Sequence, residues 1–512
     1  MEPPVPAGSV AVVFVHGMGE PRRYADSARL ATALADHAKA AHPTVDVRWD
    51  EVPAGPADRR PRAQAEIRAV LGGVTVIFRD VYWAPLVAGR THFRSLVSWL
   101  RSRAVLPLRY LLAPWASHAQ LKIDVLHEDR VALSPDQLAL LVAYERFVDR
   151  TAGRSFDDFI AFVTPRGPAI VAAAHAWRAR FTRAMGLTLW RALPLLAALL
   201  TGVVAVPMTA AWLASRIVAP PPGAGAALAT GAIAVLWLLA FPLARLLVRT
   251  LGDVEVYATY TEASERHEAH EACVAQGTAV LRRALADPAI GRVVLVGHSL
   301  GSVVAWDALR SLALEARARA GSPDAPRIDK LSRVITFGSP VDKIRFFHFA
   351  DDRADATFRR VLETLRVDTA GPPFDGRPGG LAWDNYFDPA DLVAGRLESP
   401  NDRAMTAPVR NVAVANGAFP NPFSTHLDYL RNDRVLDGLL AAIAGEARPT
   451  PSPAGVHRAR AWVTAAELLL PAAVLAVFFF RELLPLVFRA AQGDPLGWGA
   501  LAILLATLFF FA

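Results

Sequence analysis

Short apolar runs alternate with longer amphipathic stretches along much of the chain. The runs are rich in β-branched residues and have turn formers nearby, as expected of buried parallel strands; they cover residues 10–15, 74–78, 293–296, 334–337 and 409–414. Helical patterns lie among them, for example at 25–41, 262–285 and 302–319. Strands that alternate with helices predict a mainly parallel sheet with helices on both faces, which is an α/β fold.

Two stretches are apolar over a much greater length. Residues 192–215 form 24 positions without a charge, and residues 217–244 are uncharged again after Arg216. Each is long enough to cross a bilayer, which needs about 20 apolar residues. The Pro- and Gly-rich segment 219–225 would form the turn of a transmembrane hairpin. A pair of buried core helices is the alternative interpretation.

A second apolar pair lies at the C-terminus. Residues 468–480 are strongly apolar and precede Arg481 and Glu482, and residues 496–512 are uncharged. The first stretch predicts either a span that continues through Val487 or an interfacial helix, and the second is close to the minimum spanning length.

These patterns predict a division of the chain. Residues 1–83 and 251–447 would be two parts of one α/β domain, interrupted by a helical insertion or cap at 84–186 and the transmembrane hairpin at 187–250. In the insertion, apolar residues 105–115 precede mostly helical polar sequence such as 135–150. A linker at 448–462 would lead into a C-terminal membrane segment at 463–512.

Composition supports a membrane protein. Hydrophobic residues make up 53% of the chain, and the mean hydropathy is +0.27. The net charge of +7 suits nucleic acid or an anionic membrane. No zinc-finger spacing, RNA-binding signature or basic run with aromatics is present, so we expect no nucleic-acid partner. The single cysteine, Cys273, excludes an intrachain disulfide framework and a Cys-ligated metal cluster.

The most specific motif lies in residues 292–305, RVVLVGHSLGSVVA. An apolar strand leads into Gly297, His298, Ser299, Leu300 and Gly301, and a helix pattern follows. G-x-S-x-G between a strand and a helix is the nucleophile elbow, in which glycines leave room around a sharply turned serine. Ser299 is therefore the candidate nucleophile.

A second motif follows the first predicted strand. Residues 10–19, VAVVFVHGMG, end in His16, Gly17, Met18 and Gly19, an H-G-x-G pattern of the kind that forms an oxyanion hole. Two backbone N–H groups there would stabilise a tetrahedral oxyanion. We assign one to Met18 or a close neighbour and the other to Leu300, and expect His16 to shape the loop rather than act as a base.

The phrases VFVHGMGE, VGHSLGSVVA, ITFGSP, NYFDPADLV and HLDYL together resemble the α/β-hydrolase superfamily, in particular its lipase- and esterase-like members. The resemblance covers about residues 10–80 and 253–444. It implies an α/β-hydrolase fold and the chain order serine, acid, histidine.

The candidate base and acid follow from that order. Of the histidines after Ser299, His348 comes too early and His457 adjoins the linker, which leaves His426 in the loop beyond the last predicted strand. The acid is expected in the loop at 381–393, which offers Asp384, Asp388 and Asp391. We prefer Asp391, because the turn 388–391 suits an acid that points toward the histidine, with Asp388 next.

These residues predict hydrolysis of an ester, in particular a lipid acyl ester, through an acyl-enzyme on Ser299. Acyl transfer by the same fold and a non-catalytic membrane scaffold remain alternatives. No metal or organic cofactor is expected, and the oligomeric state is open. Arginines flank the first hairpin on the side of the α/β domain, whereas Arg216 alone lies near its turn, so we expect this domain to be cytoplasmic, on an inner or plasma membrane.

Overall fold

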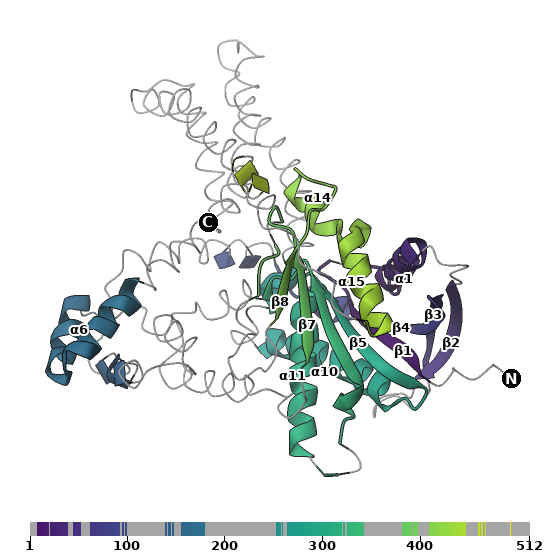
Figure 1. Cartoon of the computed structure of the whole chain (residues 1–512), viewed down its shortest axis with the longest axis horizontal. Coiled ribbons are helices and arrows are strands. Elements are labelled where there is room, and N and C mark those ends of the chain that lie inside the picture. Colours follow the sequence, from purple (N-terminus) through teal and green to yellow (C-terminus); the bar gives the residue numbers. More distant parts are fainter. Residues whose placement is uncertain are drawn as a thin grey trace. The chain divides into compact units, whose positions relative to one another are not determined.

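The computed structural model of the chain describes mainly its α/β part (Figure 1). The described residues are 8–19, 21–38, 45–52, 62–92, 155–179, 252–257, 264–319, 325–341, 381–391, 393–397 and 409–446, with a few single positions and short pieces around 95–99, 139–147 and 459–463. The chain divides into two compact units, one of residues 1–90, 126–134 and 256–461 and the other of residues 91–125, 135–255 and 462–512.

The first unit is built on an eight-stranded sheet in the order β2-β3-β4-β1-β5-β6-β7-β8. Its strands are β1 (Ser9–Val15), β2 (Val45–Val52), β3 (Arg62–Leu71), β4 (Val74–Val81), β5 (Ile290–His298), β6 (Leu331–Phe337), β7 (Ala382–Phe387) and β8 (Arg410–Ala413). All pairings from β4 to β8 are parallel, and β3 is antiparallel to both β2 and β4. The predicted α/β fold with a mainly parallel sheet is therefore confirmed.

The five predicted strands appear as β1, β4, β5, β6 and β8. The strands β2, β3 and β7 were not predicted. β2 and β3 mix apolar and charged residues, as is typical of antiparallel strands rather than of the apolar strands of a parallel sheet. β7 carries two buried polar residues, Asp384 and Asn385. The prediction that residues 381–393 form a loop is wrong for 382–387, because hydrogen bonds inside the sheet pair these polar side chains.

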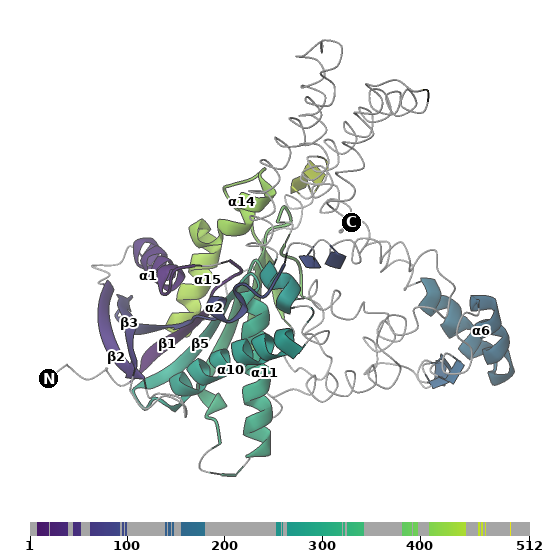
Figure 2. The ribbon, with the colours of Figure 1, turned by 180° about the vertical axis from the view of Figure 1, so that it is seen from behind.

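Helices cover both faces of the sheet (Figures 1 and 2). On one face, α1 (Ala25–Ala38) contacts β3 and β4, and α15 (Asp433–Ala444) contacts β4 and β6. On the other face, α10 (Ser264–Ala286) and α11 (Gly301–Ala318) pack against each other and against β1 and β5. β1 lies between these layers and is buried along its whole length, as its uninterrupted apolar run requires.

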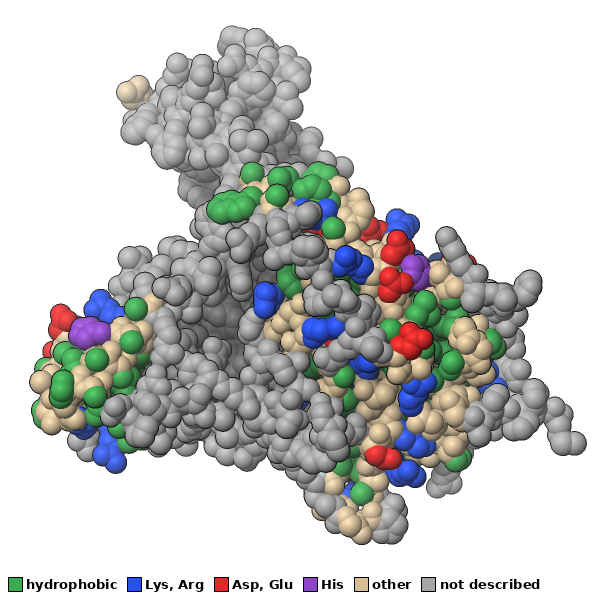
Figure 3. All heavy atoms as spheres, in the orientation of Figure 1, with side chains coloured by type: hydrophobic (Ala, Val, Ile, Leu, Met, Phe, Trp, Pro, Cys, Tyr) green, Lys and Arg blue, Asp and Glu red, His purple; other side chains and the backbone are tan. Residues whose placement is uncertain are grey.

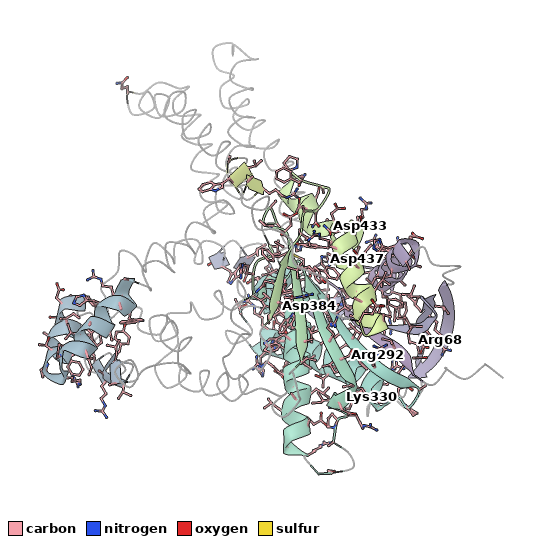
Figure 4. The ribbon with its side chains drawn as sticks, in the orientation of Figure 1. Arg68, Arg292, Lys330, Asp384, Asp433 and Asp437 are labelled. Atoms are coloured by element: carbon pink, nitrogen blue, oxygen red, sulfur yellow. The ribbon has the colours of Figure 1, made fainter. Side chains whose placement is uncertain are left out.

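The core of the first face joins β1, α1 and α15. Val12 and Phe14 of β1 pack in one cluster with Leu30 and Leu34 of α1 and Leu439 of α15. Polar contacts reinforce this layer. Asp437 of α15, labelled in Figure 4, lies 2.7 Å from Nε2 of His37, and Arg292 of β5 donates to the carbonyl oxygen of Ile443 at 2.9 Å. These two contacts tie α15 to α1 and to β5.

The described part of the predicted insertion contains helices. It includes α6 (Phe156–Val163), which begins with a capping box between Ser155 and Asp158, and a helix at 168–179. Rings of Tyr144, Phe159 and Trp177 form an aromatic cluster in this second unit. The first unit extends through α2 (Ala84–Val87) to Arg90, beyond the predicted boundary at residue 83.

Within the described residues, no helix combines the length and the apolar character needed to cross a membrane. The stretches 192–215, 217–244, 468–480 and 496–512, from which the membrane spans are predicted, lie outside those residues. So do the apolar stretch 105–115 and the Pro-rich part of the linker at 448–453. The membrane segments stay predictions.

Candidate active site

Ser299 occupies a sharp turn between β5 and α11. Its φ of +52° lies in the left-handed region, and among the described non-glycine residues only Tyr24 shares a positive φ. Such a conformation is unfavourable for a residue with a side chain and persists only where surrounding contacts enforce it. Here the Ser299 N–H donates to the carbonyl oxygen of Phe337 at 3.1 Å, and the hydroxyl of Ser302 donates to the Ser299 carbonyl oxygen at 2.6 Å.

The two glycines of the motif allow this turn to pack. A Cβ on Gly297 would lie 2.6 Å from Cα of Ser302. A Cβ on Gly301 would overlap the carbonyl oxygens of Val15 and His16. Both positions therefore need glycine, because the atoms that a side chain would meet are backbone atoms that cannot move aside.

Ser299, His426 and Asp391 form one hydrogen-bonded chain. Ser299 Oγ lies 2.8 Å from Nε2 of His426, and Nδ1 of His426 lies 2.8 Å from Oδ2 of Asp391. All three residues are buried. The Asp391 carboxylate selects the tautomer of His426 that carries its proton on Nδ1, which leaves Nε2 free to accept the proton of Ser299.

The sheet brings these three residues to one edge. β5, β6 and β7 are parallel and in register up to His298, Phe337 and Tyr386. Ser299 follows β5 directly, Asp391 follows β7, and His426 lies on α14 (Pro422–Leu427) beyond β8. Residues far apart in the chain thus meet at the carboxyl ends of neighbouring strands, where α/β folds place their sites.

The Asp391 carboxylate is held by further donors. Its Oδ1 accepts from the N–H groups of Val393 at 2.7 Å and Ala394 at 3.1 Å, and its Oδ2 accepts from the hydroxyl of Tyr429 at 2.8 Å. Burial raises the pKa of Tyr429 well above its ordinary value, so the phenol remains a donor. These bonds fix the direction in which the carboxylate points.

Asp384 and Asp388, the other two candidate acids, contact other partners. Asp384, labelled in Figure 4, lies within β7, and its Oδ1 accepts from Nε of Arg410 at 2.9 Å. Asp388 pairs with Arg460 at 2.8 Å and accepts from the N–H groups of Ala390 and Asn416. His348 and His457, the two histidines after Ser299 that the sequence disfavours as bases, lie outside the described residues.

The loop of His16, Gly17, Met18 and Gly19 passes beside the serine. A Cβ on Gly17 would lie 2.9 Å from Cβ of Ser299, so the backbone runs past the nucleophile with no room for a side chain. Gly19 has a φ of +101°, a conformation that glycine adopts without the strain that a side chain would cause. Leu300 is the residue after Ser299 and is fully buried. The backbone N–H groups of Met18 and Leu300 remain the proposed oxyanion donors.

His16 is engaged in shaping its own loop. Its Nδ1–H donates to the carbonyl oxygen of Gly17 at 2.8 Å, and its Nε2 accepts from the N–H of Trp83 at 3.3 Å. The indole of Trp83 donates to the carbonyl oxygen of His16 at 2.9 Å, and the two rings stack with centroids 5.1 Å apart. Burial lowers the pKa of His16, so the ring stays neutral.

His298 also supports the site as a neutral ring. Burial, together with the neighbouring His426, lowers the pKa of His298 to about 3. Its Nε2–H donates to the backbone carbonyl oxygen of His426 at 3.4 Å, and the two rings are stacked with centroids 5.5 Å apart. His298 therefore braces the backbone of the candidate base.

Several of these contacts were not foreseen from sequence. Tyr429 follows His426 by three residues, a helical spacing that could have suggested a shared environment. Trp83 and Arg460 carry no such signal, because they lie 67 and 72 residues from their partners His16 and Asp388.

No group of three or more His, Cys, Asp or Glu residues within the described part of the chain is arranged to hold a metal ion. A scan against protein-family models, a search of curated proteins and a search of solved structures each found no match to this chain. The geometry of Ser299, His426 and Asp391 therefore carries the functional argument by itself.

Proposed function

We propose that this protein is a membrane-anchored serine hydrolase of the α/β-hydrolase fold that cleaves carboxylic esters. The observation that carries the proposal is the chain of two 2.8 Å contacts from Ser299 through His426 to Asp391, on a serine held in a left-handed conformation. A serine, a base and an orienting carboxylate in this order are the parts that nucleophilic acyl transfer needs.

The proposed mechanism has two half-reactions, and His426 accepts and then donates a proton in each of them. Ser299 Oγ attacks the ester carbonyl carbon while His426 Nε2 takes its proton, and the Asp391 carboxylate stabilises the imidazolium. The backbone N–H groups of Met18 and Leu300 stabilise the oxyanion. His426 then gives the proton to the departing alcohol, which leaves an acyl-enzyme. His426 then takes a proton from water while the water oxygen attacks the acyl carbon, and it returns that proton to Ser299 Oγ as the carboxylic acid leaves.

A membrane lipid is the proposed substrate class. The uncharged stretches 192–215 and 217–244 would anchor the enzyme in a bilayer, with the α/β domain on the cytoplasmic side. Hydrophobic side chains gather on the surface over α14 (Figure 3), and Leu427, directly after His426, is 73% exposed. An apolar surface next to the base suits an acyl substrate that arrives from a membrane.

A fluorophosphonate, which forms a covalent bond with activated serines, tests the proposal in membranes that contain the full chain. We expect labelling of the native protein and none of Ser299→Ala. The matched control is Ser322→Ala, an exposed serine beyond α11, which should label normally. Labelling of Ser299→Ala at the native rate would show that another residue reacts.

Product analysis separates hydrolysis from acyl transfer. Long-chain lipid esters in vesicles and a short soluble ester are supplied with and without an added alcohol. Free fatty acid as the product in both cases supports a hydrolase, and a new ester that forms with the alcohol supports an acyltransferase. If the protein is labelled by the fluorophosphonate but turns over neither substrate, its substrate is a different ester. If the protein is not labelled, the result favours the alternative of a non-catalytic membrane scaffold.

A further inference from the structure

Arg460 reaches two loops of the candidate site from a helical position close to the C-terminal apolar region. Its Nη2 donates to Oδ2 of Asp388 at 2.8 Å and to the carbonyl oxygen of Asn416 at 2.8 Å, and its Nε lies 3.4 Å from Oδ1 of Asp388. The guanidinium carbon lies 4.2 Å from the ring centroid of Phe419. One side chain thus contacts both the loop after β7 and the loop between β8 and α14.

Asp388 joins the same two loops. Its Oδ1 accepts from the N–H of Ala390 at 2.8 Å, and its Oδ2 accepts from the N–H of Asn416 at 2.7 Å. The carboxylate is fully buried, and the side chain of Arg460 is only 15% exposed. A buried carboxylate needs partners that replace water, and Arg460 supplies hydrogen bonds and a positive charge in a forked contact.

Short paths lead from this pair to both sides of the Asp391–His426 hydrogen bond. The N–H of Asp388 donates to the hydroxyl of Tyr429 at 2.9 Å, and this hydroxyl donates to Asp391 at 2.8 Å. On the histidine side, Nδ2 of Asn416 donates to the carbonyl oxygen of Thr425, the residue before His426, at 2.7 Å. A shift of Asp388 or Asn416 would therefore displace Asp391, His426 or both.

We propose that Arg460 is a positioning residue that keeps Asp391 and His426 in register by clamping their two loops. The inference rests on the proposed role of Ser299, His426 and Asp391. The segment that precedes the C-terminal apolar region then has a role besides linking the two parts of the chain, because its Arg460 helps to hold the catalytic residues in place. An ordinary structural ion pair would contribute to the free energy of unfolding without altering the reactivity of Ser299 in folded molecules.

The test compares Arg460→Met, Arg460→Lys, Asp388→Asn and the double variant Asp388→Asn with Arg460→Met, all in the full chain. Two quantities are measured well below the thermal midpoint: the rate constant of fluorophosphonate labelling, and amide hydrogen exchange by mass spectrometry. Arg434→Met is the matched control, because it removes an exposed arginine from α15.

Arg460→Met should slow labelling by about 10- to 100-fold, since displacing catalytic groups by about 1 Å costs on this scale. Arg460→Lys should recover part of the rate. In the Asp388→Asn background, Arg460→Met should add less than about twofold, because the two side chains act as one unit. Exchange should quicken at 388–397 and 414–426 but not in β5, and Arg434→Met should change nothing.

Other results overturn the inference. Native labelling rates in Arg460→Met, or equal slowing in the presence and absence of the Asp388 carboxylate, would show that Arg460 does not act through Asp388. If the native protein is not labelled at all, the proposed function is wrong. Hydrogen exchange is then the only measurement that tests whether Arg460 holds the two loops together. Faster exchange confined to the two loops would still support the clamp, and unchanged exchange would reject it.

Discussion

The two sides of Ser299 are built in different ways. On the elbow side, Gly297 and Gly301 and the loop of Gly17 bring backbone against backbone, so the geometry follows from steric exclusion over a few residues. On the acid and base side, Asp391 and His426 are positioned by hydrogen bonds between loops that lie far apart in the chain. A side chain that overlaps backbone atoms forces the backbone to move. A hydrogen-bond network, by contrast, can lose one hydrogen bond and retain most of its geometry.

This difference predicts an abrupt response to substitution at the elbow and a graded response across the network. The residues that take part in the proton transfer are expected to show the largest loss of rate. Those that only support them should show smaller losses, in the order of their distance from the reacting atoms.

The largest effect is expected at the base and the acid. His426→Ala and Asp391→Asn should each lower turnover by about 10³-fold or more, because either change leaves Ser299 without a correctly oriented base. Steady-state rates with a short soluble ester measure this. Asp388→Asn is the comparison and should cost far less, since Asp388 contacts Arg460 rather than His426. The reverse order would move the role of acid to Asp388.

Gly301→Ala should come next and should act on the fold. The added Cβ would overlap the carbonyl oxygens of Val15 and His16, so β1 and α11 must separate, at a cost of about 3 kcal/mol or more. The thermal midpoint of the purified protein should fall by several degrees, and the molecules that remain folded should be labelled more slowly. Gly417→Ala is the control, because a Cβ there would lie 3.4 Å from Oδ2 of Asp428, an ordinary contact. Equal stability of the two variants would contradict the steric account.

A pH effect of intermediate size is expected from His298. Because burial holds its folded pKa at about 3, below the ordinary 6.5, the unfolded chain binds the proton more tightly. Its contribution to stability is therefore complete above about pH 6.5 and is lost as the pH falls from 6.5 toward 3. At pH 5.5 the loss should be about 1.4 kcal/mol.

The variant His298→Gln isolates this contribution. It keeps a donor for the carbonyl oxygen of His426 but does not titrate in this range. Denaturant unfolding of the native protein and the variant at pH 7.5 and 5.5 measures the difference. A difference in free energy of unfolding that stays constant between the two pH values would show that His298 is not buried as a neutral ring.

The smallest effect is expected at Tyr429, one step behind the acid. Tyr429→Phe removes one of the donors to Asp391 while the N–H groups of Val393 and Ala394 remain. The loss of a hydrogen bond to a charged group is worth about 1.5 to 3 kcal/mol, and the remaining donors should limit the fall in kcat to about 10-fold. Comparison of kcat with KM locates the effect, since substrate binding should not change. A loss as large as that of Asp391→Asn would mean that the network has no redundancy.

Prediction from the sequence was most accurate where a single segment contains all the residues that determine the local structure. Residues 292–305 contain the strand, the two glycines, the serine and the helix, and the structure forms them as β5, the turn at Ser299 and α11. The buried run at 10–15 likewise becomes β1 with helices on both faces. Prediction was weaker for β7, because its buried Asp384 and Asn385 look like loop residues until Arg410, Thr336 and Asn411 are seen beside them.

By itself, then, the sequence determined the strand and helix periodicities of the central sheet, the elbow around Ser299 and the glycine loop after β1, because steric limits and hydrophobic burial act over neighbouring residues. It narrowed the acid to three aspartates. Only the tertiary structure decided that Asp391 faces His426 while Asp388 faces Arg460, that Trp83 fixes His16, and that Tyr429 joins the acid loop to the helix behind it. Those choices depend on which carboxyl ends of parallel strands become neighbours, and strand order is a property of the folded sheet rather than of any one segment.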